Sequence, residues 1–396
     1  MAMSQKQKNS LILLTLVLIG LNMRPLLTSI GPMLPQLREA SGLSFSLAAL
    51  LTALPVIAMG ILALAGNWLS RYISERYSVA LSLLFIALGA LLRDLAPHSA
   101  ILLSSALLGG IGIGIIQAII PGVIKRLFHR RMPVVMGLWS AALMGGGGLG
   151  AALTPWLAQQ SAVWYHALAW WALPAIVALI GWILQRTTAT PDTQPNAPIA
   201  SLRLHLHPRV WILGIYFGLI NGGYTSLIAW LPPYYMQSGS SAQSSGSLLA
   251  LLTLGQAAGA LLMPILTRHQ DRRKVLLFAL LLQLAGFCGF IWLPQQLPVC
   301  WALLCGFGLG GAFPLSLVLA LDHSPHAPIA GRLVALMQGI GFIIAGVSPW
   351  LSGFLRSVTG NYLVDWVFHA LCVVGLMLLT LRFVPSRYPA AWREVP

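Results

Sequence analysis

The sequence is poor in charged residues, and above all in acidic ones. Charged side chains make up 8% of its 396 residues, and only eight residues are aspartate or glutamate. Soluble domains carry about 25% charged residues, so this chain cannot cover its surface with side chains that water solvates well. The scarcity of charge therefore excludes a soluble enzyme, an extracellular disulfide scaffold and a disordered protein.

Cysteine is also scarce, and its positions follow no functional pattern. The four cysteines all lie in apolar runs of the second half of the chain: Cys288, Cys300, Cys305 and Cys372. None of them has the spacing of a metal-ligand set or of a disulfide framework, so we interpret them as small buried residues. We accordingly predict no metal site and no cofactor.

What the sequence has in abundance is long hydrophobic runs. Hydrophobic residues make up 58% of the chain, and a backbone embedded in lipid must form helices or a closed barrel to satisfy its hydrogen bonds. The runs are continuous, and most approach or exceed the roughly 20 residues that a helix needs to cross a bilayer. We therefore predict an all-α membrane protein with twelve transmembrane helices. The predicted spans are residues 11–34, 45–69, 78–92, 101–124, 133–157, 162–184, 210–231, 247–266, 275–293, 298–321, 333–355 and 362–384.

A polar segment with four prolines divides these spans into two sets of six. Such a segment is typical of a linker. The predicted organisation is a cytoplasmic N-terminus, a six-helix bundle, a cytoplasmic linker, a second six-helix bundle and a cytoplasmic C-terminus. The boundaries are residues 1–10, 11–184, 185–209, 210–384 and 385–396.

The basic residues gather on one side of this topology. If the N-terminus is cytoplasmic, nineteen of the 23 lysines and arginines lie in cytoplasmic segments, and only Arg38, Arg93 and Arg356 lie in outer loops. Cytoplasmic loops of membrane proteins carry an excess of Lys and Arg, so this bias predicts that both termini are cytoplasmic. The net charge of +15 is then mostly a topology signal, and a nucleic-acid partner is not expected.

The two halves repeat each other in sequence. Short motifs recur in the same order about 200 positions later, among them Leu34-Pro35 as Leu231-Pro232 and His166-Ala167-Leu168 as His369-Ala370-Leu371. Two six-helix halves in parallel orientation are the arrangement of the major facilitator fold, which binds its substrate near the bilayer midplane between the halves. The repeat therefore predicts this fold and solute transport by alternating access.

Arg24 is the most informative single residue. It lies about 20 Å along the first predicted helix from Leu11, where a charged side chain costs about 2.5–3.5 kcal/mol or more. Arginine stays protonated, and its planar fork suits small oxyanions. All eight acidic residues map to loops or helix ends. We therefore interpret Arg24 as the group that binds an anionic substrate; the alternative is that it pairs with a carboxylate or with carbonyls between helices.

The same lack of deep carboxylates bears on energy coupling. Proton-driven transporters commonly place Asp, Glu or His along the pathway. No carboxylate is predicted in the middle of a helix, so coupling through one is not favoured. His166 and His369, near the outer ends of the sixth and twelfth spans, are candidate relays, although such residues more often serve packing. Uniport, exchange and joint movement of substrate and proton remain alternatives.

Further polar residues lie at depths similar to that of Arg24. Asn221 corresponds to Arg24 under a shift of 197 positions, and its amide can donate a hydrogen bond to a substrate held by one cation. Each of the other polar residues alone would serve as interhelical packing, but as a set they are interpreted as cavity lining. They are Asn22, Gln117, Tyr224, Thr225, Gln256 and Gln338.

Two kinds of segment are candidates for conformational gating. The fifth span holds four consecutive glycines, Gly145, Gly146, Gly147 and Gly148, each of which weakens a helix by about 1 kcal/mol relative to alanine. Close helix packing is one interpretation of this run, and bending during transport is the other.

The second kind is the pair of short basic loops after the second and eighth spans. The segment from Gly66 to Arg76, which includes Arg71, resembles the loop signature Gly-x-x-x-Asp-Arg of the major facilitator superfamily. It departs from the signature at Ser70, which stands where the aspartate is expected. The second copy keeps the aspartate in Asp271-Arg272-Arg273. The charge contact that the family uses to latch its conformation is therefore questionable in the first half and expected only in the second.

A narrower resemblance covers nearly the whole chain, from about residue 11 to residue 392. The motifs that carry it are Leu21-Asn22-Met23-Arg24-Pro25, Gly145-Gly146-Gly147-Gly148, Asn221-Gly222-Gly223-Tyr224, His269-Gln270-Asp271-Arg272-Arg273 and Met337-Gln338-Gly339-Ile340-Gly341. They resemble the bacterial cyanate transporter family, whose relatives are similar to 2-nitroimidazole exporters. The resemblance implies a bacterial inner-membrane protein that moves cyanate, a linear monovalent anion, for use by a cytoplasmic cyanase.

The leading prediction is thus a cyanate permease in which the two bundles rock against each other and Arg24 binds the anion. We expect a monomer with no partner besides its substrate and membrane lipid. The alternative is an exporter of a neutral or aromatic compound such as a 2-nitroimidazole, for which Trp139, Tyr224 and Trp230 would supply stacking surface. An enzyme is not expected, because the spans contain no buried Ser/His/Asp set, metal cluster or catalytic acidic pair.

Overall fold

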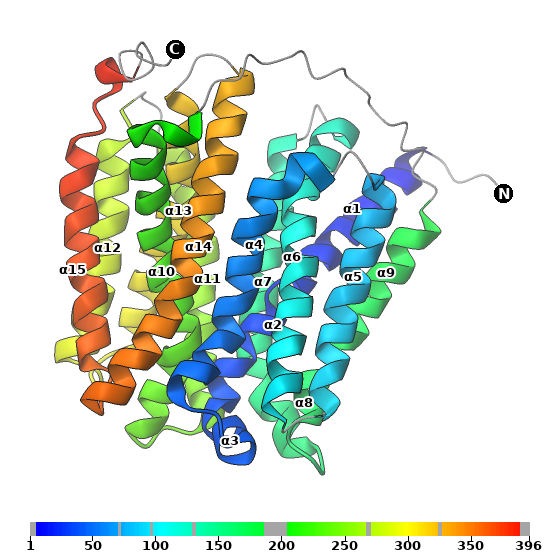
Figure 1. The fold of residues 1–396 in the computed structure, drawn as a ribbon, viewed down its shortest axis with the longest axis vertical. Helices are drawn as coiled ribbons and strands as arrows, with labels where there is room; N and C mark the ends of the chain where they lie inside the picture. The colour runs from blue at the N-terminus through cyan, green and yellow to red at the C-terminus, as the bar shows by residue number, and fades with distance from the viewer. Residues whose placement is uncertain are drawn as a thin grey trace.

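The apolar runs of the sequence form long helices that stand side by side in two groups (Figure 1). The computed structural model describes residues 5–69, 73–95, 98–128, 132–185, 204–266, 271–323 and 327–388. The first group consists of α1 (Gln5–Asn22), α2 (Pro25–Thr28), α3 (Ile30–Ser41), α4 (Phe45–Leu69), α5 (Glu75–Leu92), α6 (Ser99–Leu127), α7 (Met132–Gln160), α8 (His166–Ala169) and α9 (Ala172–Leu184).

The second group has fewer and longer helices. It consists of α10 (Pro208–Gln237), α11 (Ala242–Leu266), α12 (Arg273–Trp292), α13 (Pro298–Asp322), α14 (Ala327–Thr359) and α15 (Leu363–Leu381). Three short 3-10 helices complete the described structure: η1 (Arg93–Leu95), η3 (Leu204–Leu206) and η4 (Pro385–Arg387). The predicted linker lies mostly outside the described residues, and its last two residues belong to α10.

The helices agree with the predicted membrane architecture. Eleven segments of the described residues are long and apolar enough to cross a membrane. The remaining predicted span, the fifth (residues 133–157), is present as α7, which has 29 residues but is not among these eleven. α7 packs against α1 and α2 in its own half and against α11 in the other. The chain is therefore a multi-pass membrane protein with two bundles, as predicted.

The first predicted span differs from the prediction, because it is not one continuous helix. α1 ends at Asn22 and α2 begins at Pro25. Proline has no N–H to donate and disfavours helical geometry at the residue before it, so the helix is interrupted and Arg24 lies in the break. A second interruption at Ser29 separates α2 from α3. The prediction of an unbroken helix over residues 11–34 is therefore wrong.

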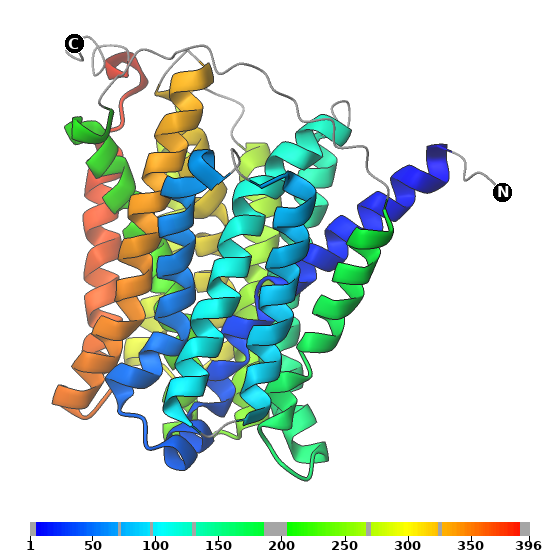
Figure 2. The same cartoon turned by 45° about the vertical axis from the view of Figure 1, so that its right-hand side comes forward.

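The sixth predicted span, residues 162–184, is also divided, into α8 and α9, with Trp170 and Trp171 between them. The two views together show α1 running obliquely across the first bundle (Figures 1 and 2). Its tilt brings the break at Arg24 to the inner side of that bundle, since α2 contacts both α7 and α10.

The two bundles meet mainly along three helix pairs: α4 with α14, α7 with α11, and α3 with α10. Glycines allow a close approach in the first pair. A Cβ added at Gly60 would lie 2.8 Å from the carbonyl oxygen of Gly339, and one at Gly346 would lie 2.9 Å from the backbone nitrogen of Ile57. Small residues at such contacts let helix backbones pack directly on each other.

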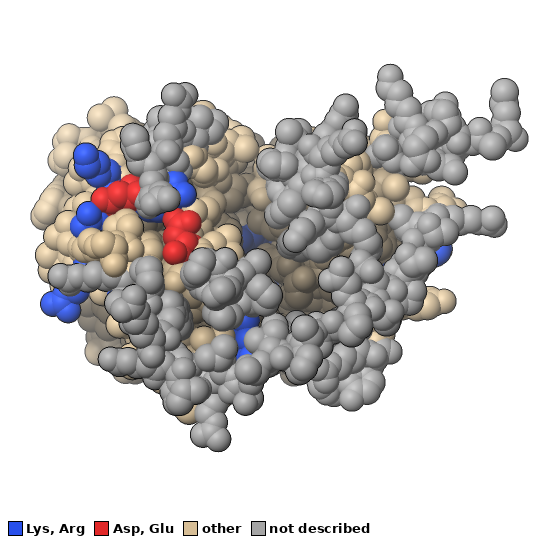
Figure 3. Space-filling model, turned by 90° about the horizontal axis from the view of Figure 1, so that it is seen from above, with Lys and Arg blue, Asp and Glu red and all other residues tan. Residues whose placement is uncertain are grey.

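The interface between the bundles is closed at one end and recessed at the other. At the end where α3 leads into α4, Phe45 packs on Trp230 with ring centroids 5.9 Å apart, and a Cβ at Gly31 would lie 2.5 Å from the carbonyl oxygen of Ile228. Seen from the opposite end, where α1 begins and α15 ends, the surface is hollowed between the two bundles (Figure 3).

Candidate functional site

Arg24 is a buried cation with no counter-charge among the described residues. Its side chain lies in the break between α1 and α2 and is only 9% exposed. Its Nε atom is buried and has no hydrogen-bond partner. Within the described residues, the carboxylates that form ion pairs do so with other side chains, and none pairs with Arg24. Because an unpaired buried charge is costly, this position favours the binding of a small anion.

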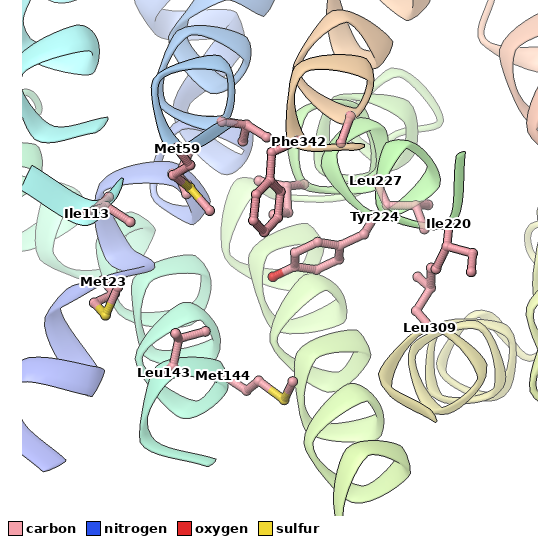
Figure 4. Close-up of a cluster of buried hydrophobic side chains, with 14 of the residues drawn as sticks. Met23, Met59, Ile113, Leu143, Met144, Ile220, Tyr224, Leu227, Leu309 and Phe342 are labelled. Carbon is pink, nitrogen blue, oxygen red and sulfur yellow. The ribbon is translucent and has the colours of Figure 1, made fainter. Parts of the chain in front are cut away.

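Tyr224 of α10 faces Arg24 from the other bundle. The Cζ atom of Arg24 lies 5.0 Å from the centroid of the Tyr224 ring, a distance at which the ring quadrupole attracts a cation. The Tyr224 hydroxyl is buried and has no hydrogen-bond partner. Figure 4 shows this hydroxyl pointing away from Ile220 and Leu227, toward the space between the bundles. A guanidinium and a phenolic O–H from opposite bundles are thus both free to donate.

Two more unpartnered polar atoms come from neighbouring helices. The indole N–H of Trp139 on α7 and the amide oxygen of Gln256 on α11 are buried without partners. Trp139 packs beside Gly20 of α1, one turn before Arg24. Gln256 follows Thr253 by one turn on α11, and its backbone packs against Gly310 of α13. Together with Arg24 and Tyr224, these residues form the central polar set, which draws on both bundles.

The glycine run of α7 brings the broken helix close. A Cβ at Gly146 would collide with the carbonyl oxygen of Leu21, which is the carbonyl that Pro25 leaves without an intrahelical donor. A Cβ at Gly147 would lie 3.2 Å from the Cβ of Arg24. Gly146 and Gly147 therefore allow α7 to support the break and leave room for the Arg24 side chain.

The two remaining glycines of the run face elsewhere. A Cβ at Gly148 would lie 2.9 Å from the Thr253 hydroxyl on α11, so this glycine allows the two bundles to approach each other. A Cβ at Gly145 would have no neighbour within 4 Å. Three of the four glycines therefore allow close helix packing. Bending of α7 at this run during transport stays a prediction.

Arg93 is a second buried arginine, which the sequence analysis assigned to an outer loop. It lies in η1, between α5 and α6, where the outer loop is predicted, but its side chain is 0% exposed. It donates to the carbonyl oxygen of Leu26 (2.8 Å) and to the hydroxyls of Ser29 and Ser105 (3.3 Å each). Leu26 lies in α2, and Ser29 lies at the second interruption of the first span. Arg93 therefore holds the broken helix in place from the end of α5.

Three predicted site residues are engaged in packing. The Asn22 amide donates to the carbonyl oxygens of Leu18 and Pro174, at 2.7 and 3.0 Å. The Thr225 hydroxyl is 2.6 Å from the carbonyl oxygen of Ala345, and the Asn221 amide donates to the carbonyl oxygen of its own helix one turn earlier, at 2.8 Å. The bonds of Asn22 and Thr225 fit the interhelical interpretation, whereas Asn221 bonds within α10; a role of these three residues in substrate binding stays a prediction.

Gln117 of α6 and Gln338 of α14 are half-buried. Gln117 lies one turn along α6 from Ile113, which Figure 4 places among the side chains around the central space. Gln338 precedes Gly339, which faces α4 of the other bundle. Both positions are compatible with the predicted lining role, which stays a prediction.

The predicted latch of the first half falls largely outside what the structure describes. Arg71 is not among the described residues, and only the backbone of Gly66 is. Arg76 donates to the carbonyl oxygen of Ile183 at the end of α9 (2.8 Å). Arg76 therefore fastens α5 to α9 within its own bundle.

The second loop forms ion pairs with two partners. Arg273 binds both carboxylate oxygens of Asp271, at 2.9 and 2.7 Å, and this bonding lowers the pKa of Asp271 below its usual value. Arg272 pairs with Asp322 at the end of α13, at 3.0 Å. The contacts of this loop thus stay within the second bundle, and their role in latching is untested.

The closed end holds two arginines that also violate the charge bias. The Cζ atoms of Arg38 and Arg356, which come from opposite bundles, lie 3.4 and 4.8 Å from the centroid of the Phe45 ring. Arg356 is also 5.0 Å from the ring of Tyr362. These residues line a cavity of about 390 Å³. Trp230 packs on Phe45 and Tyr362 at this end. This aromatic packing separates the cavity from the central polar set.

Two helical bundles with a buried polar set between them are the arrangement expected of a membrane transporter. The sequence comparisons assign the chain to the same class of protein. Residues 12–346 match the Major Facilitator Superfamily, so the chain belongs to this family of membrane transporters and is not an enzyme. It is 70% identical over 382 residues to the cyanate transport protein CynX of Escherichia coli, covering 96% of this chain and 99% of that protein. It is 28% identical to the 2-nitroimidazole transporter of the same species, covering 94% of each chain.

Solved structures confirm the fold. A crystal structure of the D-xylose-proton symporter superposes with a TM-score of 0.75 at 17% identity, covering 94% of this chain and 97% of that one. The inward-open xylose transporter XylE of Escherichia coli gives a TM-score of 0.74 at 14% identity, covering 96% of this chain and 99% of that one. At such low identity the likeness concerns the fold alone.

Proposed function

We propose that this protein carries cyanate across the bacterial inner membrane by alternating access, with Arg24 as the anion-binding group. The observation that carries the proposal is the buried guanidinium of Arg24, which has no carboxylate partner among the described residues. A single cation suits a single negative charge. Charge-assisted hydrogen bonds from a guanidinium are stronger than neutral ones, and the free Tyr224 hydroxyl supplies a further donor.

A relative that is highly similar over nearly the whole chain supports cyanate as the substrate. The protein with which this chain shares 70% of its residues is named a cyanate transport protein. Cyanate is small and linear, so one end can accept from Arg24 while the rest lies against Tyr224. The polar set comes from both bundles, so a bound anion would contact both and would sense their relative movement.

The orientation proposed for the chain places both termini in the cytoplasm. The charge bias of the loops supports this orientation. The beginning of α1 and the end of α15 lie on the same side of the molecule (Figure 1). The hollow between the bundles opens on that side (Figure 3). In this orientation the structure is inward-facing, closed at the end where Phe45 meets Trp230, and rocking of the bundles would open that end.

Uptake of labelled cyanate by purified protein in liposomes tests the proposal. Arg24→Gln should lower uptake by about 10- to 150-fold, because a hydrogen bond to a charged group is worth about 1.5–3 kcal/mol. Arg24→Lys should retain part of the activity, since the charge remains without the planar fork. The matched control is Arg382→Gln, which removes an exposed arginine after α15 and should leave uptake unchanged.

Two results would contradict the proposal. Uptake by Arg24→Gln equal to wild type, in protein that elutes as a folded species, would remove Arg24 from the site. Absence of cyanate uptake by the wild-type protein, together with export of a 2-nitroimidazole, would favour the neutral-substrate alternative. That alternative draws on the 2-nitroimidazole relative and on Tyr224 and Trp139, but it gives no role to the buried charge.

A further inference from the structure

A second buried acid–base pair lies inside the C-terminal bundle, apart from the central polar set. Asp365, in the first turn of α15, is 1% exposed, and His369, one turn later, is 3% exposed. The Oδ1 atom of Asp365 lies 3.5 Å from Nε2 of His369. Ionisable residues inside a membrane bundle are costly and are usually functional. The sequence analysis placed Asp365 at a helix end and did not foresee this burial.

The pair has few polar neighbours to stabilise a charge. Apart from the nearby hydroxyl of Ser352, the carboxylate oxygens of Asp365 have no hydrogen-bond partner among the described residues. His369 Nε2 and Trp366 Nε1 have none among them either. The ring of Phe287 stacks on His369, with centroids 5.5 Å apart. An unbalanced charge in such surroundings is unfavourable. One proton held between the carboxyl and the imidazole makes the pair neutral. Proton binding by the pair is therefore favourable.

The other titratable groups near the pair are not acidic at neutral pH. Tyr362 and Cys372, next to and on α15, are within electrostatic reach of Asp365, and Tyr234 of α10 packs on Trp366. The side chain that faces Asp365 from α14 is Ser352, and α12 contributes Phe287 and the neutral amide of Gln283. The proton of the pair is therefore not shared with a second carboxylate among these neighbours.

A chain of hydroxyls leads from this pair toward the central polar set. Ser352, which faces Asp365, donates to the hydroxyl of Ser226 on α10 at 2.9 Å. The hydroxyls of Ser226 and Ser348 are 3.0 Å apart. Ser226 follows Tyr224 by two residues on the same helix. The proton pair and the Arg24–Tyr224 contact thus lie on opposite sides of one segment of α10.

Gln283 of α12 contacts the same segment. Its buried amide has no hydrogen-bond partner at either atom, and a Cβ added at Gly223 would lie 3.1 Å from its Nε2. Movement of α10 at Gly223 and Tyr224 would therefore change the surroundings of both Gln283 and the Asp365–His369 pair. This shared segment is a physical route by which substrate and proton can affect each other.

The pair also lies close to the closed, outer end of the interface. Tyr362, one turn before Asp365, lines the cavity that holds Arg38 and Arg356. A proton therefore has a short path from that cavity to the carboxyl when the outer end opens.

We infer that the Asp365–His369 pair is the proton-binding site of this transporter and takes up one proton with each anion. This inference rests on the proposed function. The proton bonds to a carboxylate oxygen or to Nε2, and it leaves to water on the other side; no other bond forms or breaks. The proton neutralises the pair, and the combined movement of one proton and one cyanate transfers no net charge.

The experiment separates accumulation from exchange in liposomes that contain the purified protein. With an inward proton gradient, wild-type protein should accumulate labelled cyanate. The Asp365→Asn variant should lose at least tenfold of this accumulation while still exchanging internal for external cyanate, because exchange needs no net proton movement. Gradient-driven accumulation by Asp365→Asn at the wild-type level would overturn the inference. Failure of wild-type exchange would instead count against the proposed function.

The chain supplies a matched control in its first half. Asp94 and His166 also form a pair, at 2.5 Å, but their side chains are 47% and 43% exposed. Asp94→Asn should therefore leave both accumulation and exchange unchanged. If Asp365→Asn does not fold, proton flux measured with a pH-sensitive dye during wild-type uptake decides the question. About one proton entering per cyanate supports the inference, and no proton movement overturns it.

Discussion

The two bundles start from the same helical repeat but build its first helix in opposite ways. In the N-terminal bundle the helix is broken at Arg24-Pro25, whereas α10 continues for 30 residues through the corresponding Asn221-Gly222. Proline interrupts a helix because it lacks an N–H and clashes with the preceding turn, whereas glycine only weakens it. The replacement of proline by glycine between the repeats thus separates a buried backbone break from a continuous helix.

The two bundles also differ in where their buried ionisable side chains lie. The broken helix leaves Arg24 unpaired beside the interface, while Asn221 satisfies its amide within its own helix. The second bundle instead holds its ionisable residues deeper, in the pair of Asp365 and His369. The repeat therefore supplies a common scaffold, and the two copies have diverged into a half with the proposed anion-binding residue and a half with a buried acid–base pair.

Exchanging the two repeat residues is the severest test of this division. The double variant Arg24→Asn with Asn221→Arg keeps the composition but moves the cation into an unbroken, packed helix. We expect at least about 100-fold less cyanate uptake, since the anion loses its charge-assisted bonds. Asn221→Ala alone should change uptake by no more than about threefold, because this amide is already bonded. Substantial uptake by the exchanged protein would show that the cation need not lie at the break.

Removal of Arg93 tests whether the broken helix needs its bridge. Arg93→Met leaves the carbonyl of Leu26 and two buried hydroxyls without a donor, and each such loss costs about 1–3 kcal/mol. We expect a clear fall in thermal stability and in uptake, measured by a melting assay in detergent and by flux. The second half has no basic residue between Lys274 and Arg332, so Leu293→Met at the end of α12 is the control. Wild-type stability of Arg93→Met would refute the bridging role.

Adjacent glycines of α7 should respond differently to alanine. Gly146→Ala places a methyl group against the Leu21 carbonyl, and the resulting overpacking should cost about 1–3 kcal/mol. Gly145→Ala meets no neighbour and should be neutral or stabilising by up to about 1 kcal/mol, because alanine favours helix. Melting temperatures of the two variants measure the contrast. Equal behaviour would mean that the run serves flexibility and not packing.

The smallest effect is expected at the loop of the second half. Its ion pair with Arg273 lowers the pKa of Asp271, so the pair stabilises the protein above the pKa of the unfolded carboxyl. This contribution is lost as the pH falls through the lower, folded value. Exposed pairs contribute little, so Asp271→Asn should lower the melting temperature slightly at neutral pH and not at all in acid. A large loss of transport by this variant would indicate a latch.

The sequence was sufficient for the features that depend on local composition. Membrane-spanning helices follow from run length, and α4 has the predicted bounds. The depth of Arg24 follows from its position in the first run. The break at this residue was also predictable, because Pro25 carries a known cost inside a helix, but the length of the apolar run concealed it.

Burial at helix ends was not predictable in the same way. Arg93 and Asp365 both lie near helix ends, where sequence alone suggests contact with water, yet both are enclosed by neighbouring helices. The available signal was the charge bias itself, since Arg38, Arg93 and Arg356 are its three exceptions. Each has specific contacts in the structure. An exception to a topology rule was therefore a better indicator of a structural role than depth in the span.

The bond between Arg93 and Leu26 joins residues 67 positions apart, and this separation matters for biosynthesis. When the first span leaves the ribosome, the carbonyl of Leu26 cannot yet meet its donor, which is made only after two further spans. The first span must therefore enter the bilayer in a provisional form and reach its final bent shape when the third arrives. A nascent chain that stops before Arg93 should hold Arg24 at the wrong angle, and assembly of the proposed anion site is thus tied to the order of synthesis.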